Sequence, residues 1–178
     1  MRKRSMEELG RKSAEEFKQA EKIPVRIVLE NIRSAYNVGS VFRTADAFLI
    51  EAIYIIGYSA RPPHKEIKKT ALGAEETVDW KYFKTATEAI GELKKEGYTV
   101  YAVEQARGSC ELQTIDYEPG QKLAVIFGNE VTGVEQSTLH LCEGCIEIPQ
   151  WGMKHSLNIA TAAGVVLWEL VRTGILKD

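Results

Sequence analysis

Apolar residues follow two patterns along this chain: short continuous runs, and longer stretches in which they recur at helical spacing. The short runs predict buried strands at 25–29, 52–56, 77–81, 98–103, 123–127 and 145–148. The helical spacing predicts helices at 5–21, 38–49, 66–72, 86–96, 134–141 and 156–173. Such alternation is typical of an α/β domain with a mainly parallel sheet and helices on both faces.

Polar turns follow three of the apolar runs, within 31–37, 128–133 and 149–158. Asn37, in the first turn, is a good N-cap for the helix that follows it. Ser156, in the third turn, is a good N-cap for the last helix. In an open parallel sheet, turns at the carboxyl ends of strands are where ligands bind. We therefore expect these turns to carry groups for binding as well as for packing.

The length of 178 residues suits one domain with a sizeable core, and no repeat or low-complexity linker divides it. We expect a single domain over 1–178, with 1–22 as a short basic N-terminal helical extension. The first residues lack the apolar stretch of a signal peptide, and no apolar run reaches transmembrane length. These features predict a cytoplasmic protein without a membrane segment.

The net charge of −2 does not indicate a nucleic-acid binder, but the cations are clustered. Residues 1–26 carry eight lysines and arginines against five glutamates, and 61–69 form a second basic segment. Both segments are candidates for phosphate contacts, which set affinity without reading sequence. The alternative is that they are only solvated surface.

Three cysteines, an odd number, argue against a disulfide framework. Cys142 and Cys145 are spaced as a metal or redox pair, but there is no second such pair to complete a zinc site. Cys145 also leads into a predicted strand, whereas a redox pair opens a helix. We interpret the cysteines as reduced structural thiols and expect no metal.

The three polar segments, taken in order, resemble the signature motifs of the SpoU/TrmH family of RNA ribose 2′-O-methyltransferases, within the SPOUT superfamily. The first motif is matched by Asn37, Gly39, Arg43, Thr44 and Ala45, and the second by Phe127 through Gly133. The third is matched by Ile148, Pro149, Gly152, Ser156, Leu157 and Asn158. The resemblance spans 31–169, and three motifs in the right order make it specific.

The resemblance implies a methyl transfer from S-adenosylmethionine (SAM) to a ribose 2′-hydroxyl of tRNA or rRNA. It also implies a C-terminal deep trefoil knot and a homodimer; general topology rules would reject a knot. The residues that it places in catalysis are Arg43, Asn37, Glu130, Ser156 and Asn158. Those that it places at the cofactor are Gly128, Ile148, Leu157, Val103 and Ser156. Candidate RNA contacts are Arg33, Asn37, Arg43, Arg61 and Lys65.

Each of these assignments has a structural alternative. Arg43, whose family counterpart assists removal of the 2′-hydroxyl proton with the substrate phosphate, could instead pair with Asp46 on a helix surface. Glu130 could orient Arg43, bind substrate, or be an exposed turn carboxylate. Gly128 could let the backbone approach the cofactor, or only serve its turn.

Four positions depart from the family pattern, of which Ala160 and Thr161 depart only mildly from its usual small polar residues. Leu49 stands where the family commonly has glycine, so the turn there is expected to differ. Gln150 replaces a frequent apolar residue and is expected to alter the floor of the cofactor pocket.

Other functions remain to be distinguished from ribose methylation. One is a base methyltransferase of the same superfamily, and another is a non-catalytic RNA-binding or assembly protein that kept the fold. A small-molecule-binding α/β domain unrelated to RNA is a third. The sequence lacks the glycine fingerprint Gly-x-Gly-x-x-Gly, which argues against a Rossmann-type methyltransferase or dehydrogenase.

Overall fold

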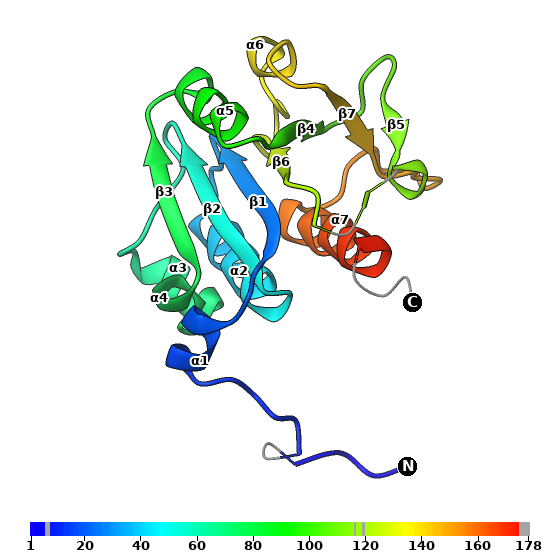
Figure 1. The fold of residues 1–178 in the computed structure, drawn as a ribbon. Helices are drawn as coiled ribbons and strands as arrows, with labels where there is room; N and C mark the ends of the chain where they lie inside the picture. Colours follow the sequence, from blue (N-terminus) through cyan, green and yellow to red (C-terminus); the bar gives the residue numbers. More distant parts are fainter. Residues whose placement is uncertain (6–7, 116, 119, 175–178) are drawn as a thin grey trace.

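A computed structural model describes residues 1–5, 8–115, 117–118 and 120–174 of the chain (Figure 1). The elements, in chain order, are α1 (Ala14–Gln19), β1 (Ile23–Glu30), α2 (Ala35–Ala47), β2 (Ile50–Ile56), α3 (Lys65–Ala71), α4 (Ala74–Thr77), β3 (Asp79–Phe83), α5 (Ala86–Lys95), β4 (Thr99–Val103), β5 (Cys110–Glu111), the 3-10 turn η1 (Leu112–Thr114), β6 (Leu123–Phe127), α6 (Gln136–Leu139), β7 (Gly144–Glu147) and α7 (Ile159–Gly174).

The strands form one seven-stranded sheet in the order β3-β2-β1-β6-β4-β7-β5. Every strand pair described is parallel, with Leu29 of β1 opposite Phe127 of β6 at the centre. Parallel strands point the same way, so the segments after β1, β4, β6 and β7 emerge at one edge of the sheet. This arrangement confirms the predicted α/β architecture.

Two hydrophobic layers cover the sheet. The helices α2, α3, α4 and α7 pack on one face through residues such as Phe42, Ile67 and Leu167. The other face is covered mainly by α5, through Ile90 and Leu93. Helices on both faces explain why the central strands read as continuous apolar runs. Within the described ranges, no helix is long and apolar enough to cross a membrane.

The predicted strands agree with the observed ones to within two residues at each end. A helix is predicted at 5–21, but the observed helix α1 is shorter. It begins after Ser13, which forms a capping box with Glu16. The expected connection 104–122 contains β5 and η1, and α4 was not predicted. These elements have two to four residues, too few for a periodic pattern to develop.

Two predicted helix caps were wrong. The helix α2 begins three residues earlier than expected, because Ser34 and not Asn37 is its N-cap and accepts a hydrogen bond from the Asn37 N–H at 3.3 Å. The helix α7 begins at Ile159, and Asn158 Oδ1 accepts from the Ala160 N–H at 2.9 Å. Ser156 therefore lies in the preceding loop, where it is exposed.

Leu49, which departs from the family pattern, has a backbone conformation that is unusual for a leucine. Leu49 has φ of 52°, in the left-handed region where glycine is favoured. The backbone thus keeps the conformation for which glycine is suited, while the leucine side chain packs against the core beside Ile50.

Candidate active site

A cavity of about 520 Å³ lies at the carboxyl ends of β4, β6 and β7. Its walls come from the turn 128–133 and the loop 148–158, the second and third polar segments of the sequence. The lining includes all five residues expected at the cofactor, namely Val103, Gly128, Ile148, Ser156 and Leu157. The edge of the sheet therefore brings together residues that are up to 54 positions apart in the chain.

Gly128 is required by its own turn. A Cβ at this position would lie 2.2 Å from the Gly133 carbonyl carbon and 2.2 Å from the Val134 nitrogen. The turn is closed by two backbone hydrogen bonds between Asn129 and Gly133, of 3.0 and 2.9 Å. Of the two readings of Gly128, the geometry supports a role in closing the turn, which leaves its backbone at the cavity wall.

Glu130 joins the second polar segment to the first. Its carboxylate accepts from the Arg33 N–H at 2.8 Å, the Ser34 N–H at 3.0 Å and Asn37 Nδ2 at 2.9 Å. Partial burial alone would raise the pKa of Glu130, but these hydrogen bonds outweigh it and hold the pKa below its ordinary value. The ionised carboxylate thus sits at the N-terminus of α2, where a negative charge is favoured.

Asn37 joins the first polar segment to the third. Asn158 Nδ2 donates to Asn37 Oδ1 at 3.2 Å, while Asn37 Nδ2 donates to Glu130. A chain of hydrogen bonds, Glu130–Asn37–Asn158, therefore connects all three segments. Glu130 and Asn158 both line the cavity, so this chain runs along its wall.

Arg43 lies apart from this chain. It is exposed on α2, is not among the residues lining the cavity, and has no hydrogen-bond or ion-pair partner within the described residues. The alternative pairing with Asp46 is not found, and Asp46 accepts a hydrogen bond from the Thr77 hydroxyl at 3.2 Å instead. Glu130, occupied by the N-terminus of α2, does not orient Arg43 within the chain.

The expected RNA contacts lie outside the cavity. Arg33 has an exposed side chain beside the backbone that Glu130 holds. Arg61 lies over the Tyr82 ring, 4.0 Å from its centroid, and Lys65 is exposed in the first turn of α3. Of the five candidates, only Asn37 contacts the cavity wall through its side chain, while Arg33 contacts Glu130 through its backbone N–H.

Sequence reasoning missed Glu104 and Gln105, which follow β4 and line the cavity. Glu104 Oε2 accepts from the Val134 N–H at 2.9 Å, and Gln105 Nε2 donates to the His155 carbonyl at 3.0 Å. The pair thus ties the second polar turn to the third loop. The sequence pattern could have identified them, because a polar pair at the end of an apolar run is the same pattern that indicated the other turns.

The cysteines are free, and they lie outside the residues that line this cavity. Burial raises the pKa of Cys142 to about 12, and burial also raises the pKa of Cys145. A thiol in this state is a weak nucleophile and a poor metal ligand. In the part of the chain that the structure describes, no three His, Cys, Asp or Glu side chains gather as a metal site.

Comparison with known proteins identifies relatives of this chain. The family model described as the SpoU rRNA Methylase family matches residues 24–168. A tRNA (guanosine(18)-2′-O)-methyltransferase of Thermus thermophilus is 31% identical over 172 residues, covering 97% of this chain and 86% of that protein. The 23S rRNA (guanosine-2′-O-)-methyltransferase RlmB of Neisseria meningitidis is 28% identical, covering 87% of this chain and 61% of that protein.

A solved structure has the same fold and holds a cofactor. The AdoMet-bound rRNA methyltransferase from Sinorhizobium meliloti superposes with a TM-score of 0.79 at 28% identity, covering 85% of this chain and 57% of that one. The edge of the sheet that carries the cavity lies within the region matched by the family model.

Proposed function

The chain belongs to the SpoU rRNA methylase family, and from this premise we propose that it transfers a methyl group from SAM to a ribose 2′-hydroxyl of tRNA or rRNA. The observation that carries the proposal is the chain Glu130–Asn37–Asn158, which joins all three motif segments along the wall of one cavity. Asn37, Glu130, Ser156 and Asn158 are the groups of this chain that we place around the ribose.

The cavity fits SAM by size and by chemistry. Its volume of about 520 Å³ is in the range of small-molecule sites. Val103, Ile148 and Leu157 offer apolar contacts for an adenosyl group, and the turn at Gly128 offers backbone polar groups. When bound, SAM supplies a methyl group on a positively charged sulfur, which is a good leaving group.

The protein must hold the 2′-hydroxyl against that methyl group and favour loss of its proton. A bond forms between the 2′-oxygen and the methyl carbon, the sulfur keeps the electrons of the broken bond, and the proton leaves to solvent. An arginine side chain stays protonated in proteins and is a poor base. We therefore assign Arg43 as a cation that stabilises the developing alkoxide and holds the adjacent phosphate.

A homodimer would complete this site. Arg43 is exposed and lies outside the lining of its own cavity, so a second copy would present its Arg43 to this cavity. Val165 and Trp168 on α7 are 39% and 49% exposed and form an apolar surface for such contact. The trefoil knot belongs to the same proposal: β7 pairs between β4 and β5, and α7 contacts η1 in the connection that precedes β6.

The first test is transfer of label from methyl-labelled SAM to separate pools of undermodified tRNA and rRNA, followed by nucleoside analysis. We expect label in a 2′-O-methylnucleoside from one pool. Arg43→Ala should bind SAM as the wild type does and lose at least about a hundredfold in transfer rate, as for loss of a group that stabilises transition-state charge. Arg107→Ala, in the exposed loop after β4, is the matched control.

The outcomes separate the competing functions. Label in a methylated base would indicate a base methyltransferase. SAM-independent RNA binding without transfer in any pool would favour the non-catalytic protein. Undiminished turnover in Arg43→Ala would remove Arg43 from the mechanism.

A further inference from the structure

Three exposed tyrosines and three cations form a surface beside the cavity. We call it the tyrosine surface and define it as Tyr36, Tyr58, Arg61, Lys65, Lys69 and Tyr82. The side chains of Tyr58, Tyr36 and Tyr82 are 64%, 42% and 37% exposed. A single exposed ring is ordinary, whereas several aromatic rings on one region of the surface indicate an interaction site.

Two of the tyrosines, Tyr58 and Tyr36, are tied to neighbouring segments although their rings are exposed. The Tyr58 hydroxyl accepts from Asn129 Nδ2 at 2.7 Å, and the Tyr58 N–H donates to Asn31 Oδ1 at 3.4 Å. The Tyr36 carbonyl accepts from the Thr70 hydroxyl at 2.9 Å. These contacts hold the backbone at Tyr36 and Tyr58 and tether the Tyr58 hydroxyl, while both rings stay open to a partner.

The cations of the surface are available for a partner. Arg61 and Lys69 lie 4.0 and 5.9 Å from the ring centroids of Tyr82 and Tyr36. Within the described residues, neither these two nor Lys65 forms an ion pair, whereas Arg26, Lys81, Lys94 and Arg172 do. Unpaired cations beside aromatic rings fit a ligand that has both phosphates and flat apolar bases.

The surface begins at the mouth of the cavity. Asn129, which donates to the Tyr58 hydroxyl, lines the cavity and also donates to the Asn31 carbonyl at 2.8 Å. From Tyr58 the chain runs through Arg61 to α3, and α3 packs on α2 beside Tyr36. A strand of RNA with one ribose at the cavity would therefore have its neighbouring nucleotides over these rings.

We propose that the tyrosine surface binds unpaired nucleotides that flank the methylated ribose, so that the substrate is RNA in a single-stranded loop or end. The inference rests on the proposed function. A base can stack on tyrosine only when it has left its own helix, while duplex RNA presents mainly phosphates and 2′-hydroxyls. The cations alone would suit either form of RNA; the three rings decide between them.

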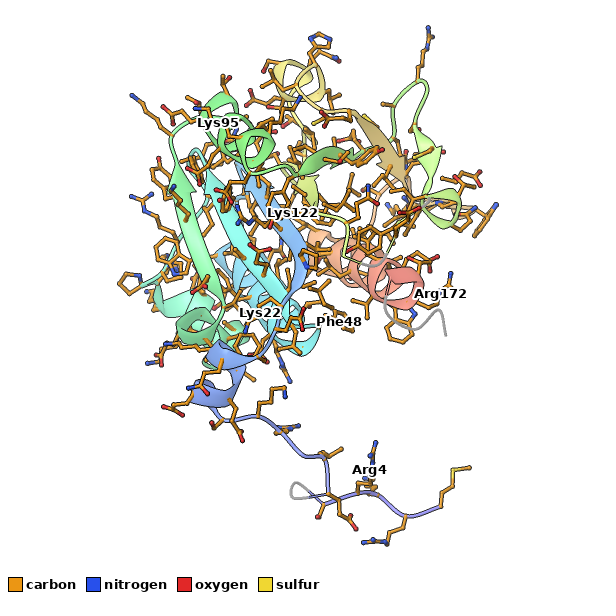
Figure 2. All side chains as sticks on the ribbon, in the orientation of Figure 1. Arg4, Lys22, Phe48, Lys95, Lys122 and Arg172 are labelled. Carbon is orange, nitrogen blue, oxygen red and sulfur yellow. The ribbon has the colours of Figure 1, made fainter. Side chains whose placement is uncertain are left out.

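Binding of fluorescein-labelled A12 RNA and of the A12·U12 duplex, measured by anisotropy at one fixed salt concentration, tests the proposal. We expect the single strand to bind more tightly. Tyr58→Ala and Tyr36→Ala should each weaken single-strand binding about tenfold, in line with stacking on one base, and change duplex binding by less than about twofold. Lys95→Ala on α5, on the other face of the sheet (Figure 2), is the control for charge.

Phenylalanine variants separate stacking from a structural role. Tyr58→Phe keeps the ring but removes the hydroxyl that accepts from Asn129, and it should bind A12 within about twofold of the wild type. Loss of binding in Tyr58→Phe, equal affinity for strand and duplex, or wild-type binding by both alanine variants would each overturn the proposal. If neither RNA probe bound, the proposal would also be overturned, and a protein partner would be the better explanation of the surface.

Methyl transfer by the same preparations keeps this test apart from that of the proposed function. With the RNA pool that accepts label, Tyr58→Ala should raise KM about tenfold and leave kcat within about twofold, since the lost contact is made equally in the ground and transition states. Ribose methylation by Tyr58→Ala with an unchanged KM would overturn the proposed role of the tyrosine surface but support the proposed function. RNA binding that depends on the tyrosines, without any methylation, would support the tyrosine surface and contradict the proposed function.

Discussion

Glu130, at the residue scale, is a single carboxylate that satisfies three donors from another part of the chain. It accepts from two backbone N–H groups ahead of α2 and from Asn37, 93 positions away. The same bond fixes the Asn37 amide so that its oxygen faces Asn158. A turn carboxylate thereby sets the orientation of a side chain that we place beside the ribose.

Replacing Glu130 should cost stability in a pH-dependent way. Because the folded pKa lies below the ordinary value near 4.5, the ionised carboxylate stabilises the fold above that pH, and the stabilisation is lost as pH falls through the folded pKa. We expect Glu130→Gln to lower the free energy of unfolding by about 1 kcal/mol at pH 7, as for loss of a cap. The difference should shrink in denaturant titrations below about pH 4.

Glu76→Gln is the matched control, because Glu76 is exposed in α4 and its side chain accepts no hydrogen bond among the described residues. A difference between Glu130→Gln and wild type that stayed constant down to acid pH would mean that the carboxylate charge is not what stabilises the N-terminus of α2.

At the element scale, α2 is positioned by close packing as well as by its cap. A Cβ on Gly39 would lie 2.1 Å from Thr70 Oγ1 and 2.4 Å from the Ile67 carbonyl oxygen. The motif glycine therefore permits α3 to lie directly on α2. This contact also orders Tyr36, whose carbonyl accepts from Thr70.

Gly39→Ala should separate α2 from α3. We expect a loss of about 1–3 kcal/mol in the free energy of unfolding, the range for overpacking of a close contact. The control is Gly91→Ala in α5, where an added Cβ meets nothing within 4 Å and should stabilise the helix by about 0.5–1 kcal/mol. Thermal unfolding of both variants checks this prediction, and similar melting temperatures would contradict it.

At the scale of the whole molecule, the proposed homodimer rests on the apolar residues of α7 and on Arg43, which has no partner within the described residues. Phe48, at the end of α2, lies beside α7 with its ring 6.1 Å from that of Trp168 (Figure 2). Trp168 and Val165 remain partly exposed on the same helix. A dimer through this helix would cover these side chains.

We expect light scattering to give twice the 19.9 kDa mass of one chain. Val165→Glu should give a single-chain mass and lose methyl transfer, since an unpaired charge in an apolar contact is strongly unfavourable. Thr87→Glu, on α5, should remain a dimer. A wild-type mass of one chain would count against the shared site.

Mixing two inactive variants tests the sharing directly. Arg43→Ala and Asn158→Ala, when mixed, should recover part of the activity if Arg43 acts in the partner's cavity, because a mixed dimer contains one intact site. No recovery from dimers that do exchange chains would place Arg43 in its own cavity.

The sequence by itself determined the longer strands and helices of this protein and two of the polar segments that line its cavity. Continuous apolar runs predicted all the longer strands, because a strand buried on both faces has no polar side. The motif resemblance identified Val103, Gly128, Ile148, Ser156 and Leu157, all of which line one cavity. The residues of one motif lie together because each residue's place in its turn depends on near neighbours. Their role at the cofactor stays a prediction.

Tertiary structure decided what depends on partners far away in the chain. Asn37 was expected to cap its helix, but Ser34 does so, and Asn37 instead contacts Glu130 and Asn158, which are 93 and 121 positions away. Glu104 and Gln105 were missed because their partners, Val134 and His155, reach them only through the strand order. Local pattern fixes which groups can form hydrogen bonds, but only the folded sheet decides which of those groups meet.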